Sequence, residues 1–255
     1  MTSERIVLLT SDCDFGRLAA SRLADMFPAL TVIVEAPISR FTLLKGRLRR
    51  LGVVQTAGQL AFMLLQRLQQ RVARGRIAEI METARLKAEW PGGGALVRVP
   101  SVNSSECIAQ LQQFKPQVIL VVGTRLIERA VPAAVNIPFI NYHAGITPKY
   151  RGVHGGYWAK AEDDLGNFGV TVHLVDEGID TGAVLYQARI TPTPRDNFST
   201  YPYLQMAAAL PLLEQAARDA MAGTLKPQGV DLPSRAWSHP TLWSYLATGV
   251  RRGVW

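Results

Sequence analysis

RIVLLTSDCDFGRLAASRLADMFPALTVIVE, residues 5–35 of this chain of 255, carries the clearest signature of a fold class. Its two ends, 5–10 and 30–35, are short apolar runs rich in aliphatic residues, as expected of buried strands. A turn at 12–16 follows the first run, and a helix is expected from about Arg17 to Met26. Strand, helix and strand in this order indicate a parallel sheet with helices packed on it.

The same alternation continues along the chain. We therefore predict an α/β fold with a doubly wound, Rossmann-like and mostly parallel sheet. Residues 1–223 are expected to form one domain, with a helical insert at about 41–90, and residues 224–255 a short C-terminal tail. Further strands are expected at 95–99, 118–122, 139–143, 168–174 and 183–190, and helices from Asn103 or Ser104 to about 114 and from about 199 to 222.

The insert carries the positive charge of the protein. Residues 40–87 hold eleven Lys or Arg and two Glu, a net charge of +9, whereas the whole chain has +8. Apolar residues keep helical spacing across the insert, and Gly52, Gly58 and Gly75 are candidate breaks. The charge fits either a solvated helical face or a docking surface for an anionic membrane, a lipid-linked substrate or a partner protein. Nucleic acid is the less favoured partner.

The composition argues against a membrane-spanning, a secreted or a metal-binding protein. At 48% hydrophobic residues the chain can bury a sizeable core, yet its apolar runs are too short to span a bilayer. The first residues lead straight into a strand, so no secretory signal is expected. The two cysteines, Cys13 and Cys107, suit a reducing cytoplasm, and neither they nor the four scattered histidines have the spacing of a metal site.

The candidate catalytic residues lie in two segments, NYHAGITPKYRG (residues 141–152) and GVTVHLVDEGIDTG (residues 169–182). Asn141 and His143 alternate on one face at the end of a strand. If the neighbouring strand also ends at this edge, Asp180 comes to lie beside His143, where ligands of open α/β sheets bind. An amide that polarises a carbonyl, an imidazole that moves a proton and a carboxylate that sets its charge are the groups needed for acyl transfer to an amine.

These motifs resemble those of the folate-dependent formyltransferase family, which includes glycinamide ribonucleotide, methionyl-tRNA and sugar-amine formyltransferases. The resemblance is strong over about residues 95–190. It implies that 1–223 is the catalytic domain and that Asn141, His143 and Asp180 are the catalytic triad, with Asp180 holding His143 protonated. It also implies N10-formyltetrahydrofolate as formyl donor, a primary amine as acceptor and no metal.

The resemblance further suggests binding residues. The turn after strand 118–122 would wrap the pterin of the folate, together with the loop before Asp180; the candidates are Gly123, Arg125, Leu126, Asp176 and Gly178. The candidates on the acceptor side are Pro148, Arg151 and His154. The loop at 145–148 matches the family's pattern only at its proline. His173, on the second strand, is interpreted mainly as a packed, hydrogen-bonded residue.

Two features that the sequence lacks disfavour particular acceptor amines. The first loop, 11–16, has one glycine and two acids, which disfavours a phosphate cradle and hence the purine intermediate. The tail is too short to be an RNA-binding barrel, which disfavours initiator tRNA. An amino sugar on a nucleotide or lipid carrier is favoured. The alternatives are a hydroxyornithine-type or other small amine, a formyltetrahydrofolate hydrolase, and a non-catalytic membrane- or partner-binding protein. We expect a cytoplasmic protein, with a peripheral position at the inner membrane face and a homodimer left open.

Overall fold

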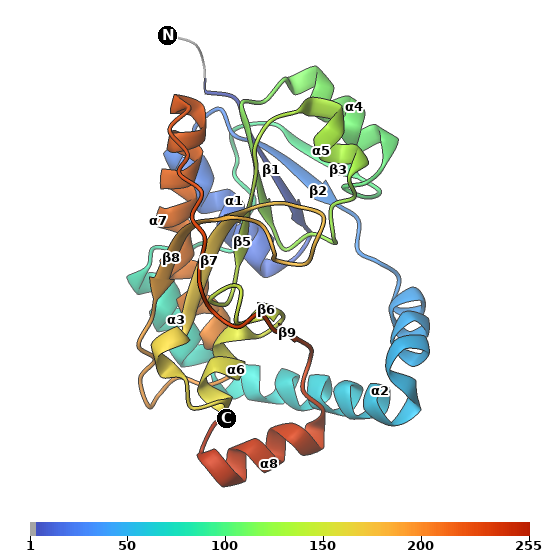
Figure 1. The fold of residues 1–255 in the computed structure, drawn as a ribbon, viewed down its shortest axis with the longest axis vertical. Helices are drawn as coiled ribbons and strands as arrows, with labels where there is room; N and C mark the ends of the chain where they lie inside the picture. The colour runs from blue at the N-terminus through green and yellow to red at the C-terminus, as the bar shows by residue number, and fades with distance from the viewer. Residues whose placement is uncertain (1–3) are drawn as a thin grey trace.

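The computed structural model describes residues 4–255, which are built around one seven-stranded sheet (Figure 1). The strand order is β3-β2-β1-β4-β5-β7-β8. The first five strands in this order are parallel, and β7 and β8 add two antiparallel pairings at one edge. The predicted α/β fold with a mostly parallel sheet is confirmed. The strands are β1 (Ile6–Ser11), β2 (Thr31–Glu35), β3 (Leu96–Val99), β4 (Val118–Val122), β5 (Phe139–His143), β7 (Gly169–Leu174) and β8 (Val184–Arg189).

Helices cover both faces of the sheet (Figure 1). On one face, α1 (Asp14–Met26) and α7 (Tyr201–Ala222) pack on Leu8 and its neighbours. On the other, α4 (Ser105–Phe114) and α5 (Ala130–Val135) pack on Leu9. Because successive side chains of a central strand enter two different cores, the strand reads as an unbroken apolar run.

The first helix begins earlier than expected, at Asp14 rather than near Arg17. Cys13 is its N-cap, and the sulfur accepts a hydrogen bond from the Gly16 N–H at 3.4 Å. A Cβ at Gly16 would collide with the Ser11 carbonyl oxygen, so glycine lets the helix approach the strand. The single glycine of this loop therefore has a packing role.

The insert forms two helices, α2 (Arg40–Val72) and α3 (Arg74–Thr83). Helical structure ends at Thr83 and does not reach residue 90 as expected. Gly52, with φ 76°, kinks α2 as predicted. Gly58 was also expected as a break and is wrong, because it lies inside α2 under the Trp243 ring. A second break falls at Ala73, between α2 and α3, and the third candidate, Gly75, lies in the first turn of α3. The segment before the kink stands apart from the sheet in Figure 1.

The N-cap of α4 is one of the two residues expected there. Its N-cap is Ser104, whose hydroxyl accepts from the Cys107 N–H at 3.2 Å. Asn103 instead accepts from the Glu128 N–H and donates to the Leu126 carbonyl, at 2.9 Å each. The Asn103 amide thus ties the start of α4 to the turn that follows β4.

Residues 224–255 contain regular structure. β9 (Ala236–Trp237) pairs with β6 (Arg151–Gly152), and α8 (Leu242–Arg252) packs on α2 (Figure 1). A third core of aromatic residues joins α2, α8 and α6 (Gly155–Ala161), with Phe62, Tyr157 and Tyr245 at its centre. A 3₁₀ turn, η1 (Leu165–Asn167), leads into β7. No helix within residues 4–255 is both long and apolar enough to cross a membrane.

Candidate active site

The candidate site lies where β4 and β5 end, beside the loop that follows β7. The expectation that β7 also ends at this edge is wrong, because β7 runs antiparallel to β5 and Leu174 pairs with Ile140 near the start of β5. The loop 175–183 folds back instead. Asp176 shapes it by accepting from the Gly178 N–H at 3.0 Å and from the Thr181 hydroxyl at 2.7 Å. The returning loop brings Asp180 to β5.

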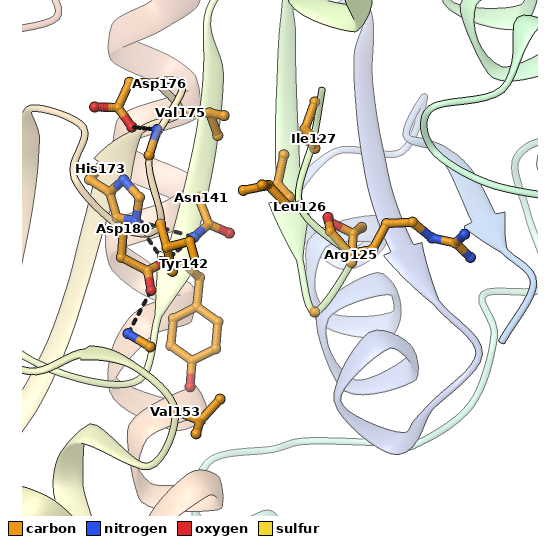
Figure 2. Close-up of a pocket in the computed structure, with 16 residues that line it drawn as sticks. Arg125, Leu126, Ile127, Asn141, Tyr142, Val153, His173, Val175, Asp176 and Asp180 are labelled. Atoms are coloured by element: carbon orange, nitrogen blue, oxygen red, sulfur yellow. Dashed lines mark hydrogen bonds and ion pairs between the residues drawn. The ribbon is translucent and has the colours of Figure 1, made fainter. Parts of the chain in front are cut away.

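Asp180 contacts both other residues of the expected triad. Its Oδ2 lies 3.3 Å from His143 Nδ1. Its Oδ1 lies 3.4 Å from Asn141 Nδ2, a contact drawn in Figure 2. The Gly152 N–H donates to Oδ2 at 2.9 Å, which holds the carboxylate in place. Asp180 has φ 52°, a left-handed conformation that Asp tolerates better than most residues. An amide, an imidazole and a carboxylate are therefore in contact at one point.

Both ring nitrogens of His143 face acceptors. Nε2 lies 2.6 Å from the Tyr150 carbonyl oxygen and Nδ1 faces the Asp180 carboxylate. Burial lowers the pKa of His143, and the Asp180 charge opposes that effect without reversing it. The expectation that Asp180 keeps His143 protonated is therefore not supported. If the neutral ring gains a proton, both of its N–H groups face hydrogen-bond acceptors, the Tyr150 carbonyl and the Asp180 carboxylate. The arrangement therefore suits uptake of a proton by His143.

Asp180 itself stays ionised. Burial raises the pKa of its carboxyl group, but the hydrogen bond with His173, the charge of His143 and the Gly152 N–H together bring the pKa below its usual value. The carboxylate is thus a fixed negative charge in a largely buried position. Such a charge stabilises a cation formed next to it.

A cavity of about 410 Å³ opens beside this cluster (Figure 2). One wall is the turn after β4, and the facing wall is β5 with the loop that returns from β7. Asn141 and Asp180 line it, whereas His143 lies behind Asp180 and is not part of the lining. All five residues that were expected to bind the donor also line it, namely Gly123, Arg125, Leu126, Asp176 and Gly178.

Arg125 contributes to the cavity mainly through its backbone. Its guanidinium points away from Asn141 in Figure 2 and lies 2.5 Å from the buried Glu35 carboxylate. The Arg125 N–H also donates to Glu35, at 2.7 Å. Glu35, at the end of β2, thereby fixes the turn that forms one wall. Sequence reasoning missed this role, although a charged residue ending an apolar strand was a signal for it.

His173 and Tyr142 also line the cavity, and sequence reasoning gave neither a place there. His173 Nδ1 donates to the Leu174 carbonyl at 2.7 Å, and Nε2 lies 3.2 Å from Asn141 Nδ2. The pairing of Asn141 with His173 across β5 and β7 produces this contact. His173 therefore orients the Asn141 amide, whose oxygen is turned toward the open side in Figure 2.

The three residues that were expected to bind the acceptor lie in three different surroundings. Pro148 lines a second hollow of about 380 Å³ that also contacts Asp180. Arg151 donates to the Ile179 carbonyl and to the Ser234 hydroxyl, so it ties the loop to the C-terminal segment. His154 packs on Phe198, with Nε2 2.9 Å from His239 Nδ1. Pro148 and Arg151 therefore lie beside the cluster, whereas His154 belongs to the aromatic core.

A third hollow, of about 530 Å³, adjoins the cavity and shares Gly152, Val153 and Ile179 with it. The outer part of α2 closes it with Arg47 and Arg50, opposite the C-terminal residues 237–239. Within residues 4–255 neither arginine forms a salt bridge: Arg47 donates to the Met63 sulfur and Arg50 to the Gly46 carbonyl. The hollow therefore has an unneutralised positive wall. The part of the chain that the structure describes holds no group of three or more His, Cys, Asp or Glu side chains suited to a metal ion.

Comparison with known families agrees with this architecture. A family model described as formyl transferase matches residues 68–204, more than half of the chain. The chain belongs to the formyl transferase family, a family of enzymes. The match includes β4, β5, β7 and the returning loop, so the candidate site lies inside it.

Curated relatives are methionyl-tRNA formyltransferases. That of Kosmotoga olearia is 28% identical over 154 residues, which cover 60% of this chain and 49% of the relative. That of Koribacter versatilis is 38% identical over 118 residues, covering 46% and 38%. The chain thus spans half or less of the length of these relatives.

Solved structures share the fold at lower identity. A 4-N formyltransferase from Francisella tularensis has a TM-score of 0.56 at 12% identity, covering 95% of this chain and 78% of that one. Glycinamide ribonucleotide transformylase 1 from Symbiobacterium toebii has a TM-score of 0.55 at 18% identity, covering 88% and 90%. At these identities the likeness concerns the fold alone.

Proposed function

We propose that this protein transfers a formyl group from N10-formyltetrahydrofolate to the primary amine of an amino sugar carried on a nucleotide or lipid carrier. The observation that carries the proposal is the contact of Asp180 with both Asn141 and His143 at the wall of a cavity, within a chain of the formyl transferase family.

The chemistry divides between the three side chains. The neutral amine attacks the formyl carbon, a new C–N bond forms, and the bond from that carbon to N10 of the folate breaks as N10 takes up a proton. In the proposed reaction the Asn141 side chain turns, so that its NH2 group, which contacts Asp180 and His173 in this structure, donates to the formyl oxygen as negative charge develops on it; one such donor contributes about 10²–10³ in turnover. The neutral His143 takes up the proton that the attacking amine loses, and the ionised Asp180 stabilises first the cationic amine and then the protonated ring.

The donor fits the wall formed by the turn after β4. Gly123, Arg125 and Leu126 offer backbone groups there, and the buried Glu35 keeps that backbone rigid. The facing loop, shaped by Asp176, closes the other side. The backbone carbonyls of Gly123 and Leu126 each accept one hydrogen bond and can accept a second, which suits a flat heterocycle with donor groups on its edge, such as a pterin.

The acceptor fits the adjoining hollow with the positive wall. Arg47 and Arg50 lie there without carboxylate partners within residues 4–255, beside the apolar Leu43 and Trp237. A carrier phosphate would pair with the arginines while the sugar amine reaches Asp180 past Gly152. The first loop is the less suitable place for a phosphate, because its Asp12 already pairs with Arg17 and Arg98. On this proposal the reaction takes place in the cytoplasm, at the inner membrane face if the carrier is a lipid.

The test is a substrate screen that follows both tetrahydrofolate release and formation of the N-formyl product. Nucleotide-linked amino sugars should support both at equal rates, and hydroxyornithine-type amines and water should support neither. Arg47→Gln with Arg50→Gln should raise KM for the acceptor at low salt with kcat nearly unchanged, and added salt should remove the difference. Release of tetrahydrofolate with water alone would assign the protein as a hydrolase.

A further inference from the structure

The inner segment of α2, residues 53–72, exposes an apolar face that nothing in residues 4–255 covers. Val53 is 73% exposed, Leu64 61% and Leu68 56%. With Leu60 they recur at spacings of seven, four and four residues, which places them on one side of the helix. The opposite side is buried, with Phe62 at 1% exposure. The helix is therefore apolar on both sides, although only one side faces the core.

Arginines border this exposed face. Arg67, Arg71 and Arg74 line a hollow of about 530 Å³, which is closed by α3 and by Tyr203 of α7. None of the three forms a salt bridge within residues 4–255, whereas Arg76, two residues further, pairs with Glu79 and Asp196. Three unneutralised guanidinium groups around one hollow favour an anion.

We propose that this face is a docking surface for an anionic phospholipid bilayer. The surface consists of Val53, Leu60, Leu64, Leu68, Val72, Arg67, Arg71 and Arg74. The arginines bind lipid phosphates, and the aliphatic side chains enter the boundary between headgroups and acyl chains. The proposal goes beyond formyl transfer and does not depend on it.

The charge and the apolar residues of this surface favour an anionic bilayer over a second copy of the chain or a nucleic acid. A second copy of the chain would bring another insert with a net charge of +9 against the first. A nucleic acid would match the arginines but would leave the row of leucines and valines in water. An anionic bilayer satisfies both, since it presents phosphates above an apolar layer.

The first experiment is co-sedimentation of the full chain with vesicles of phosphatidylcholine alone or mixed with phosphatidylglycerol. We expect binding to the mixed vesicles only, weakened by salt. Replacing Arg67, Arg71 and Arg74 together by Gln should weaken binding roughly a hundredfold. The matched control replaces the exposed Arg129, Arg189 and Arg218 by Gln; it removes the same charge and should keep binding close to wild type.

The second experiment tests the apolar part. Leu64→Gln should weaken binding to the mixed vesicles by about tenfold. Leu165→Gln changes an equally exposed leucine on η1 and should not. Circular dichroism of each variant checks that the fold is kept. Equal binding to neutral vesicles, or equal loss in the control variants, would overturn the proposal. So would a dimer in light scattering that Leu64→Gln abolishes, because the face would then belong to a second copy.

Discussion

At the scale of single residues, Asp180 holds the candidate site together. It contacts both Asn141 and His143, and the Gly152 N–H fixes its position. The carboxylate remains ionised although burial opposes this, because its neighbours offset the burial. Its charge, more than its size, is therefore what we expect the reaction to require.

Asp180→Asn tests that charge. Asn keeps the shape of the side chain and tolerates the left-handed backbone, but it cannot take the negative charge that stabilises the proton on His143. We expect kcat to fall about a hundredfold or more with little change in the melting temperature. Asp163→Asn, at φ 59° and away from the cavity, is the matched control and should behave as wild type. Similar turnover in both variants would remove the Asp180 charge from the mechanism.

At the scale of elements, close contacts fix how the helices meet the sheet. α1 lies against β1 because Gly16 has no side chain, and the His154–His239 contact joins α6 to the C-terminal segment. Each contact can be tested by a change in stability that does not involve the site.

Gly16→Ala should destabilise the protein by about 1–3 kcal/mol, because its Cβ would meet the Ser11 carbonyl oxygen, a backbone atom that cannot move without shifting β1. Gly75→Ala is the control. Gly75 also lies near the start of a helix, but nothing lies within 4 Å of its Cβ position. That variant should gain about 0.5–1 kcal/mol from helix propensity. Urea unfolding of the two variants gives the comparison, and a loss in both or a gain in both would contradict the packing role of Gly16.

The histidine contact predicts a loss of stability in acid. Burial lowers the pKa of His154 to about 3 and that of His239 to about 4, against about 6.5 in an unfolded chain. Below about pH 6.5 the unfolded chain therefore binds protons that the folded chain excludes. The contribution of the neutral pair is complete above that pH and is lost progressively as the pH falls toward 4.

Urea unfolding at several pH values checks this, with His154→Gln as the comparison. The variant lacks one of the excluded protons, so its free energy of unfolding should fall less steeply between about pH 6.5 and about pH 4. The same slope in the variant and the wild type would show that His154 does not titrate as its burial indicates.

At the scale of the whole molecule, the sheet and most of its strands could be predicted from the sequence. Apolar runs such as 118–122 mark buried strands, because both of their faces enter a core. The direction of β7 could not be predicted, since the run GVTVHL reads the same for a parallel or an antiparallel strand. That direction makes His173 the partner of Asn141, and it explains why His173 was not placed at the site.

Other parts of the site depend on contacts between distant segments. Glu35 and Arg125 lie 90 residues apart in the chain, and no local pattern pairs them. The hollow beside the cavity needs the kink at Gly52, which carries Arg47 and Arg50 toward residues 237–239. The positive charge of the insert could be predicted from the sequence. Which of its arginines lie beside the cavity and which lie elsewhere could not. The structure puts Arg47 and Arg50 beside the cavity and Arg67, Arg71 and Arg74 on the far segment.

The central claim is that the cluster around Asp180 moves a formyl group from a folate to an amine. The most direct measurement is a single turnover with N10-formyltetrahydrofolate labelled isotopically in the formyl carbon, using the amino-sugar acceptor that the screen identifies. We predict that the label appears in the N-formyl product in equal amount to tetrahydrofolate, and that Asn141→Ala and His143→Ala each slow its transfer about a hundredfold or more. Label recovered only as formate, or transfer at the wild-type rate in either variant, would contradict the claim.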